Sequence, residues 1–181
     1  PLAGSLQPAS IGRQKLLKKL NQSLGRMSTG QGQISFVSGD SGQGKTALVN
    51  EFSHQAEQSD PDLLVVQGRC AAYSGLGDSY LPFRDVLRLL TGDEEALRSL
   101  GNISSIQANK LWEQAPLSNQ IVHKFGPGLV NTLITGDSPV NPILAEDQSS
   151  GYIFEQFTLV LQKLSASHPL LIVLEDLHWA D

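Results

Sequence analysis

The run of eight residues from Gly39 to Thr46 carries the strongest chemical signal in this chain. It reads Gly-Asp-Ser-Gly-Gln-Gly-Lys-Thr and matches the phosphate-loop pattern G-x-x-x-x-G-K-S/T throughout. Glycines let such a loop adopt backbone angles that side chains forbid, so its amide groups turn toward phosphate oxygens. We expect the Lys45 ammonium to reach the β- and γ-phosphates and the Thr46 hydroxyl to coordinate Mg²⁺. The candidate phosphate-binding residues are Gly39, Asp40, Ser41, Gly42, Gln43, Gly44, Lys45 and Thr46.

The segments on both sides of this loop fit the strand–loop–helix context that a phosphate loop requires. Residues 33–38 alternate apolar and polar side chains, and this alternation predicts a strand. Residues 46–56 place Leu48, Phe52 and Ala56 on one helical face. The amino end of that helix would add its partial positive charge beneath the phosphates. A glycine- and serine-rich hairpin loop is the alternative, but both flanks favour the phosphate loop.

An apolar run that ends in two acids supplies the second half of a nucleotide site. Residues 170–174 predict a buried strand, and Glu175 and Asp176 follow it directly. In phosphoryl transfer a carboxylate at such a position holds Mg²⁺, and a neighbouring one can orient and deprotonate the attacking water. Many strands end in a charged turn, but this one comes about 130 residues after a phosphate loop, which strengthens the signal. The candidate catalytic residues are Asp176, Glu175 and Lys45, and the candidate Mg²⁺ ligands are Thr46, Glu175 and Asp176.

The rest of the chain predicts an α/β fold, that is, a parallel sheet flanked by helices. A second buried strand is expected at 63–70, and residues 1–10 look like a linker. Residues 91–150 are expected to form a helical insertion punctuated by turns at 126–128 and 138–142. Helices are predicted at 14–24, 46–56, 82–90, 93–100, 106–112, 117–124 and 151–166.

Composition excludes several classes of protein. The net charge of −5 gives no reason to expect nucleic-acid binding, and no apolar run is long enough to span a membrane. A single cysteine, Cys70, excludes an internal disulfide and suits a reducing cytoplasm; we expect it to be a small buried residue at a strand end. The chain has no initiator methionine or apparent signal peptide and stops at Asp181, so we expect it to be a piece of a longer polypeptide.

Four further segments complete a pattern. Residues 174–181 read Leu-Glu-Asp-Leu-His-Trp-Ala-Asp, and the others are Ile11-Gly12-Arg13, Gly68-Arg69-Cys70 and Tyr80-Leu81-Pro82-Phe83. Together with the phosphate loop they resemble the AAA-type ATPase domain of large bacterial signalling regulators, the signal-transduction ATPases with numerous domains. That group includes LuxR-like transcriptional regulators and ATPase modules attached to cyclase domains. The resemblance covers essentially the whole chain, with little support across residues 91–150.

The resemblance implies a P-loop ATPase fold in which residues 11–181 form the amino-terminal part of the domain. The chain would be truncated after the Walker B strand, because a further strand between the two site-bearing strands would follow Asp181. The resemblance also implies that Gly12 and Arg13 border the adenine pocket. Glu175 takes the Mg²⁺-side position and Asp176 the water-activating one. The family often has aspartate where Glu175 stands, so the division of roles between the two acids stays open.

The expected function is ATP binding with slow Mg²⁺-dependent hydrolysis that acts as a switch in a multidomain, cytoplasmic regulator. The expected partners are output domains and, through nucleotide-dependent association, further copies of the chain. One alternative is an interaction module that binds nucleotide without hydrolysing it. A second is a small-molecule kinase, which would need a basic lid, and residues 91–150 hold only Arg98, Lys110 and Lys124 as basic residues.

Overall fold

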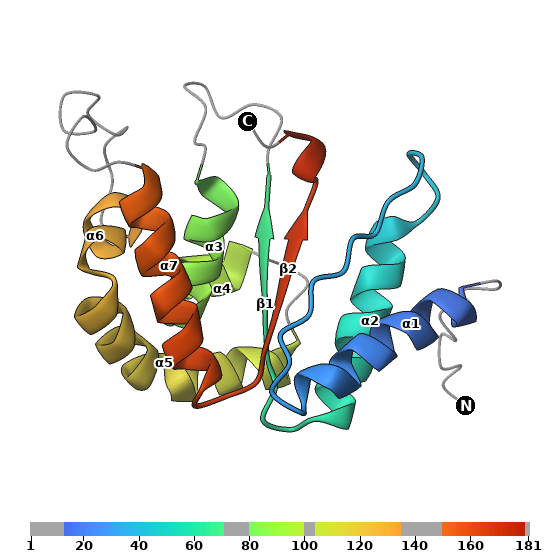
Figure 1. Ribbon diagram of the computed structural model, residues 1–181, viewed down its shortest axis with the longest axis horizontal. Helices are drawn as coiled ribbons and strands as arrows, with labels where there is room; N and C mark the ends of the chain where they lie inside the picture. Colours follow the sequence, from blue (N-terminus) through green and yellow to red (C-terminus); the bar gives the residue numbers. More distant parts are fainter. Residues whose placement is uncertain (1–12, 71–79, 100–103, 135–149, 180–181) are drawn as a thin grey trace. The chain divides into compact units, whose positions relative to one another are not determined.

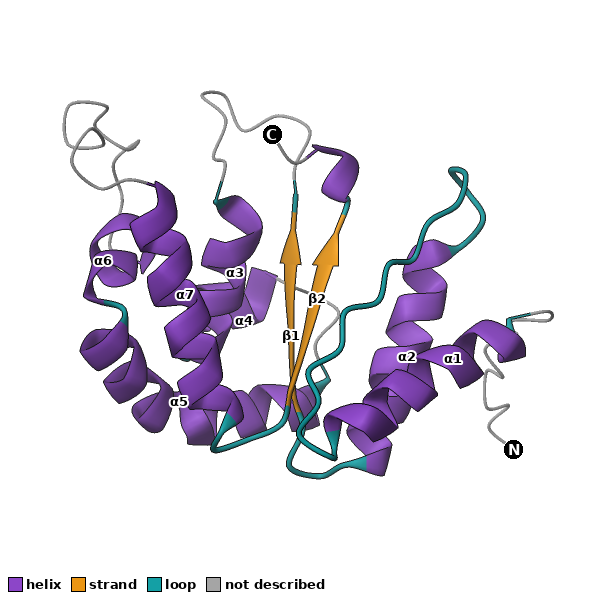
Figure 2. Ribbon diagram, in the orientation of Figure 1, coloured by secondary structure: helices purple, strands orange, loops and turns teal. Residues whose placement is uncertain are grey.

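The computed structural model describes residues 13–70, 80–99, 104–134 and 150–179, which fall into two compact units (Figure 1). The first unit, Pro1–Pro61, contains the helices α1 (Gln14–Met27) and α2 (Lys45–Ser59). The second unit, Asp62–Asp181, contains the elements coloured by type in Figure 2: β1 (Leu64–Arg69), α3 (Leu81–Leu90), α4 (Glu94–Ser99), α5 (Ser105–Phe125), α6 (Pro127–Leu129), the π-helical turn η1 (Val130–Ile134), α7 (Ser150–Ser165), β2 (Leu170–Glu175) and the 3₁₀ turn η2 (Leu177–Trp179).

The described sheet lies in the second unit and consists of β1 and β2, which pair in parallel. The register joins Leu64 to Leu170 at one end and Arg69 to Glu175 at the other. Parallel strands flanked by helices confirm the predicted α/β class. Because both strands run the same way, the residues that follow them emerge at one edge of the sheet.

The core of the second unit forms where helices cover β1. The strand begins with a run of apolar residues, and α3 turns a face of four buried side chains toward the core. Helix α7 adds a buried stripe at the same spacing. Each fully buried side chain of this size stabilises the fold by about 1.5–3 kcal/mol. The residues concerned are Val86, Leu87, Leu89 and Leu90 of α3 and Ile153, Val160 and Leu164 of α7.

A buried glutamine side chain forms a hydrogen bond with the backbone on the edge of β1 that faces away from β2. Leu64 and Cys70 use their amides toward β2, so the carbonyl of Val65 points to the opposite side. Gln107 of α5, which is fully buried, donates from Nε2 to that carbonyl at 3.2 Å. An unpaired buried carbonyl would cost free energy, so this bond fixes α5 against the strand.

Helix α5 differs from the two short helices predicted at 106–112 and 117–124, because it runs unbroken from Ser105 to Phe125. Pro116 lies inside it and is exposed, so its ring faces solvent while Ala115 and Ser118 are buried. Packing on that buried side therefore outweighs the hydrogen bond that proline removes. The turn predicted at 126–128 is also different, since α6 begins there at Pro127.

Two strand predictions need correction. Residues 31–40 contain no strand, and Ile34 and Phe36 are 86 % and 83 % exposed. A strand exists only when its backbone pairs with a neighbour, and the described part of the first unit contains no strand that could be that neighbour. The second correction concerns β2, whose residues 170–174 are only partly buried rather than buried. Neither the alternation at residues 33–38 nor the apolar run at residues 170–174 revealed these differences.

Asp93 caps α4, and its hydrogen bonds predict that its contribution to stability depends on pH. Its Oδ1 accepts hydrogen bonds from the amides of Glu95 and Ala96, and its Oδ2 accepts one from Arg88 Nε at 2.8 Å. The bond from Arg88 is the main reason why the pKa of Asp93 is lowered from 3.8. A lowered carboxyl pKa adds stability above the unfolded-state value, and that stability is lost as pH falls through the folded-state value, which lies below 3.8.

We therefore expect Asp93→Asn, which keeps the capping oxygen but loses the charge, to lower the free energy of unfolding by about 1 kcal/mol at pH 7. The difference should shrink as the pH falls below 3.8. Urea unfolding followed by circular dichroism at pH 7 and pH 3 measures it. Glu113→Gln, an exposed acid on α5, serves as the control for loss of one negative charge. An equal difference at both pH values would contradict the charge-based explanation.

Candidate functional site

The phosphate loop of the first unit leads directly into α2, which begins at Lys45. Gly42 and Gly44 have φ angles of 78° and 71°, in the left-handed region that side chains disfavour. Gly44 is also the residue that caps the amino end of α2. The first amides of a helix have no acceptor within the helix and attract anions. The loop therefore delivers the chain into the helix in the way that the sequence pattern predicts.

The side chains of Lys45 and Gln43 form hydrogen bonds with residues at the start of this loop. The Lys45 ammonium donates to the carbonyl oxygens of Gly39 at 3.0 Å and Asp40 at 2.9 Å. Gln43 Nε2 donates to Asp40 Oδ2 at 2.9 Å. Thr46 lies in the first turn of α2 and is exposed. The lysine thus folds back over the loop, and its charge lies beside the start of the loop.

Arg13 lies against the same loop. Its guanidinium donates from Nη1 to the Gly44 carbonyl and from Nη2 to the Gln43 carbonyl. A side chain at position 44 would collide with this guanidinium, which adds a second reason for glycine there. The resemblance implied that Gly12 and Arg13 border an adenine pocket. Gly12 lies outside the described residues, and the contacts of Arg13 are with the loop backbone.

The acid pair lies at the carboxyl end of β2, in the second unit. Glu175 is the last residue of the strand and is 9 % exposed, whereas Asp176 directly after it is exposed. Asp176 has a φ angle of 58°, which is uncommon outside glycine. This conformation turns the chain into η2, where the Trp179 amide donates to the Asp176 carbonyl at 2.9 Å. Consecutive acids therefore occupy different environments, one buried and one facing solvent.

Arg69 belongs to this site and was missed by the sequence analysis as a site residue. It ends β1, and the register places it opposite Glu175. Its Nη2 atom lies 3.2 Å from Glu175 Oε2 and forms an ion pair with it. The available signal was that Gly-Arg-Cys and Leu-Glu-Asp each come at the end of a predicted strand. Charged residues at the ends of adjacent parallel strands meet at one edge.

Cys70 and Trp179 are neighbours of the acid pair. Cys70 is buried, as expected, and burial is the main cause that raises the pKa of its thiol, followed by the negative charges of Asp176 and Asp85. The Trp179 side chain is 50 % exposed and contacts the ring of His178.

The two carboxylates of the acid pair are chemically suitable ligands for a magnesium ion. Mg²⁺ is commonly held by one or two carboxylates together with phosphate oxygens and water. Glu175 Oε1 is buried and has no hydrogen-bond partner among the described residues, so one carboxylate oxygen remains available as a ligand. Within the described residues there is no cluster of three or more acidic, histidine or cysteine side chains that could hold a metal alone. A cation at this pair would therefore take further ligands from outside the pair, such as phosphate oxygens and water.

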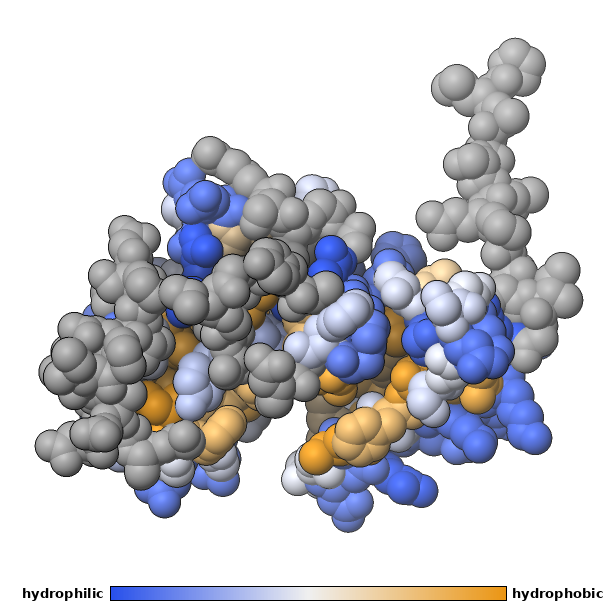
Figure 3. Space-filling view, turned by 90° about the horizontal axis from the view of Figure 1, so that it is seen from above, coloured by the Kyte–Doolittle hydropathy of each residue, from blue (hydrophilic) through white to orange (hydrophobic). Residues whose placement is uncertain are grey.

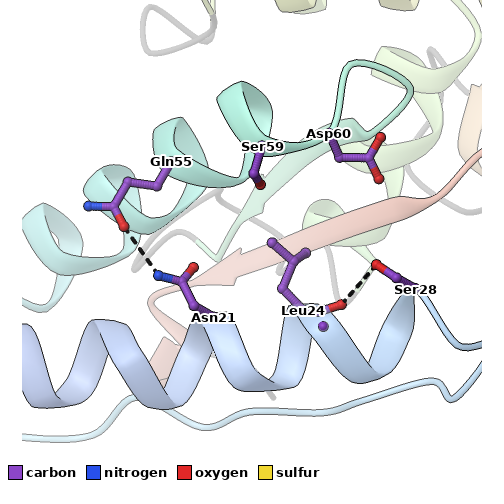
Figure 4. A pocket seen from close by; sticks show the side chains of 7 residues that line it. Asn21, Leu24, Ser28, Gln55, Ser59 and Asp60 are labelled. Carbon is purple, nitrogen blue, oxygen red and sulfur yellow. Dashed lines mark hydrogen bonds between the residues drawn. The ribbon is translucent and has the colours of Figure 1, made fainter.

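A groove between α1 and α2 is not part of the phosphate loop (Figure 4). It has a volume of about 520 Å³, and Asn21 Nδ2 and Gln55 Oε1 bridge it at 3.3 Å. Gln55, Ser59 and Asp60 line it from the carboxyl end of α2, whereas the loop joins the amino end. We assign the groove to the packing of the two helices rather than to a ligand.

The surface view of Figure 3 shows apolar areas among polar ones on the face that it presents. Exposed large apolar side chains include Ile34 and Phe36 in the first unit and Trp112 and Phe154 in the second. None of the described helices has both the length and the apolar character needed to cross a membrane.

Comparison with known proteins gives one result that covers nearly the whole chain. The family model described as the AAA ATPase domain matches residues 9–181. Among curated proteins and among solved structures, no similar chain is found. The matched range includes the phosphate loop and the acid pair together with Arg13 and Arg69.

Proposed function

Since this chain belongs to the AAA ATPase domain family, we propose that it binds ATP and hydrolyses it slowly, with Mg²⁺, as a regulatory switch. The observation that carries the proposal is the phosphate loop, whose left-handed glycines lead into the amino end of α2. A polyphosphate is the ligand that such a loop accepts, because backbone amides and a lysine charge converge on it.

The proposal gives the site residues distinct roles. Residues 39–44 surround the phosphates with backbone amides, Lys45 neutralises charge on them, and Thr46 offers a hydroxyl ligand. Bound Mg²⁺ would supply charge neutralisation at the β- and γ-phosphate oxygens. Glu175 is assigned to the metal side because its Oε1 is buried and without a partner among the described residues. Asp176 is assigned to water because its side chain faces solvent.

The wider biological role is part of the same proposal. The resemblance to large bacterial signalling regulators supports a switch that acts on output domains and on association between copies of the chain. The single cysteine, Cys70, supports a location in the reducing cytoplasm.

Binding through Lys45 gives the direct test. We expect Lys45→Ala to weaken ATP affinity by about tenfold or more, because it removes a charge-assisted contact with phosphate. Isothermal calorimetry with ATP and Mg²⁺ measures the dissociation constant. Lys18→Ala is the matched control, since Lys18 is an exposed lysine on α1 in the same unit. Equal ATP affinity for Lys45→Ala and the parent would refute the phosphate-loop assignment.

A further inference from the structure

The ion pair between Arg69 and Glu175 is unequal in its exposure. The Glu175 side chain is 9 % exposed, whereas that of Arg69 is 47 % exposed. The two residues are fixed opposite one another by the parallel register of β1 and β2. Arg69 Nη2 reaches Glu175 Oε2 at 3.2 Å, and Oε1 of the same carboxylate is buried without a partner among the described residues.

This difference in exposure decides which of the two side chains can move out of the ion pair. A buried carboxylate needs a compensating positive charge, because desolvation penalises the ionised form. Glu175 ends a paired strand and its side chain is only 9 % exposed, so its carboxylate lies largely out of contact with solvent. Arg69 can swing into water and keep its charge solvated, since almost half of its side chain already faces solvent. The guanidinium is therefore the displaceable member of the pair.

We propose that Arg69 is the resident counter-cation of Glu175 and that a divalent cation at the acid pair competes with it. Arg69 thereby sets the affinity of the site for divalent cations. This inference rests on the proposed function, because it requires Glu175 to be the metal-side acid. It adds a residue to the site whose effect has a definite sign: the arginine charge opposes metal binding.

The opposite role would give the opposite sign. If Arg69 only oriented the carboxylate toward a metal, its removal would weaken metal binding, as loss of a residue that supports a metal ligand usually does. If it competes, its removal takes a positive charge away from the cation. We expect a gain in affinity of about tenfold, the size that one like charge at contact range produces in a partly solvated site.

The experiment is a Mn²⁺ titration of the protein in the presence of saturating ADP, followed by the electron paramagnetic resonance signal of free Mn²⁺. Arg69→Gln should bind Mn²⁺ about tenfold more tightly than the parent. Arg88→Gln, which removes an arginine paired with Asp93 and Glu95 in the same unit, should leave Mn²⁺ affinity unchanged. An Arg69→Gln affinity equal to or weaker than that of the parent would overturn the proposal.

Two further variants keep the test decisive. Arg69→Lys retains the charge, so its Mn²⁺ affinity should stay within about threefold of the parent, even if Arg69→Gln fails to fold. A tenfold loss in Arg69→Lys would mean that the guanidinium orients the acid, and the competition would be refuted. Glu175→Gln separates this inference from the proposed function. If Glu175→Gln binds Mn²⁺ more weakly than the parent but Arg69→Gln does not bind it more tightly, only the competition is refuted. If Glu175→Gln binds Mn²⁺ as tightly as the parent, the assignment of Glu175 to the metal is itself refuted.

Discussion

Replacing Asp176 with asparagine is expected to lower the rate of ATP hydrolysis by about 10²-fold or more while ATP binding persists. Asparagine matches aspartate in size but cannot accept a proton from the attacking water. The backbone should tolerate the change, because Asp176 lies at a φ angle of 58° and asparagine adopts this region at least as readily as aspartate. Loss of turnover would therefore report on chemistry rather than on a distorted turn.

Phosphate release measured beside ATP affinity tests this expectation. Glu175→Gln is the matched variant, since it removes the charge of the neighbouring acid, and we expect it to change the Mg²⁺ dependence of binding as well as the rate. Loss of turnover in Glu175→Gln with normal turnover in Asp176→Asn would reverse the two roles. Equal and negligible phosphate release from the parent and both variants, with ATP still bound, would favour the nonhydrolysing interaction module.

The parts of this site that depend on local sequence could be predicted. The glycines at 42 and 44 sit in left-handed conformations that the pattern itself requires, and Lys45 opens the helix that follows. The two acids lie at the carboxyl end of the strand that the apolar run indicated, with Glu175 ending β2 and Asp176 directly after it. Each of these features depends on a few adjacent residues and on backbone preferences, which a sequence carries directly.

The features that the sequence did not predict correctly depend on contacts between residues distant in sequence. Residues 33–38 have the alternation of a strand, yet pairing decides whether a strand forms, and no described strand of that unit pairs with them. Two short helices were predicted at 106–112 and 117–124, yet packing around Ala115 and Ser118 holds α5 together as one helix. The ion pair of Arg69 with Glu175 needed the register of β1 and β2, which local patterns do not specify.

The structure explains why glycine occupies position 68 in the Gly-Arg-Cys segment. It lies in β1, one residue before Arg69, and α3 packs against this strand. A Cβ atom at Gly68 would overlap the carbonyl oxygen of Pro82 and lie 2.7 Å from its carbonyl carbon. The Gly-Arg-Cys and Tyr-x-Pro-Phe segments therefore touch one another, with glycine making the contact possible. The same contact helps to hold the end of β1, from which Arg69 reaches Glu175.

We accordingly expect Gly68→Ala to lower the free energy of unfolding by about 3 kcal/mol, at the upper end for overpacking, because the obstructing atoms belong to the backbone of α3 and cannot rotate away. Urea unfolding followed by circular dichroism measures the change as a lower transition midpoint. Gly25→Ala is the control: Gly25 lies in α1 with no atom within 4 Å of the added Cβ, so alanine should stabilise by about 0.5–1 kcal/mol. A midpoint for Gly68→Ala equal to that of the parent would show that β1 and α3 do not meet at this residue. The register that pairs Arg69 with Glu175 would then lose its support from α3.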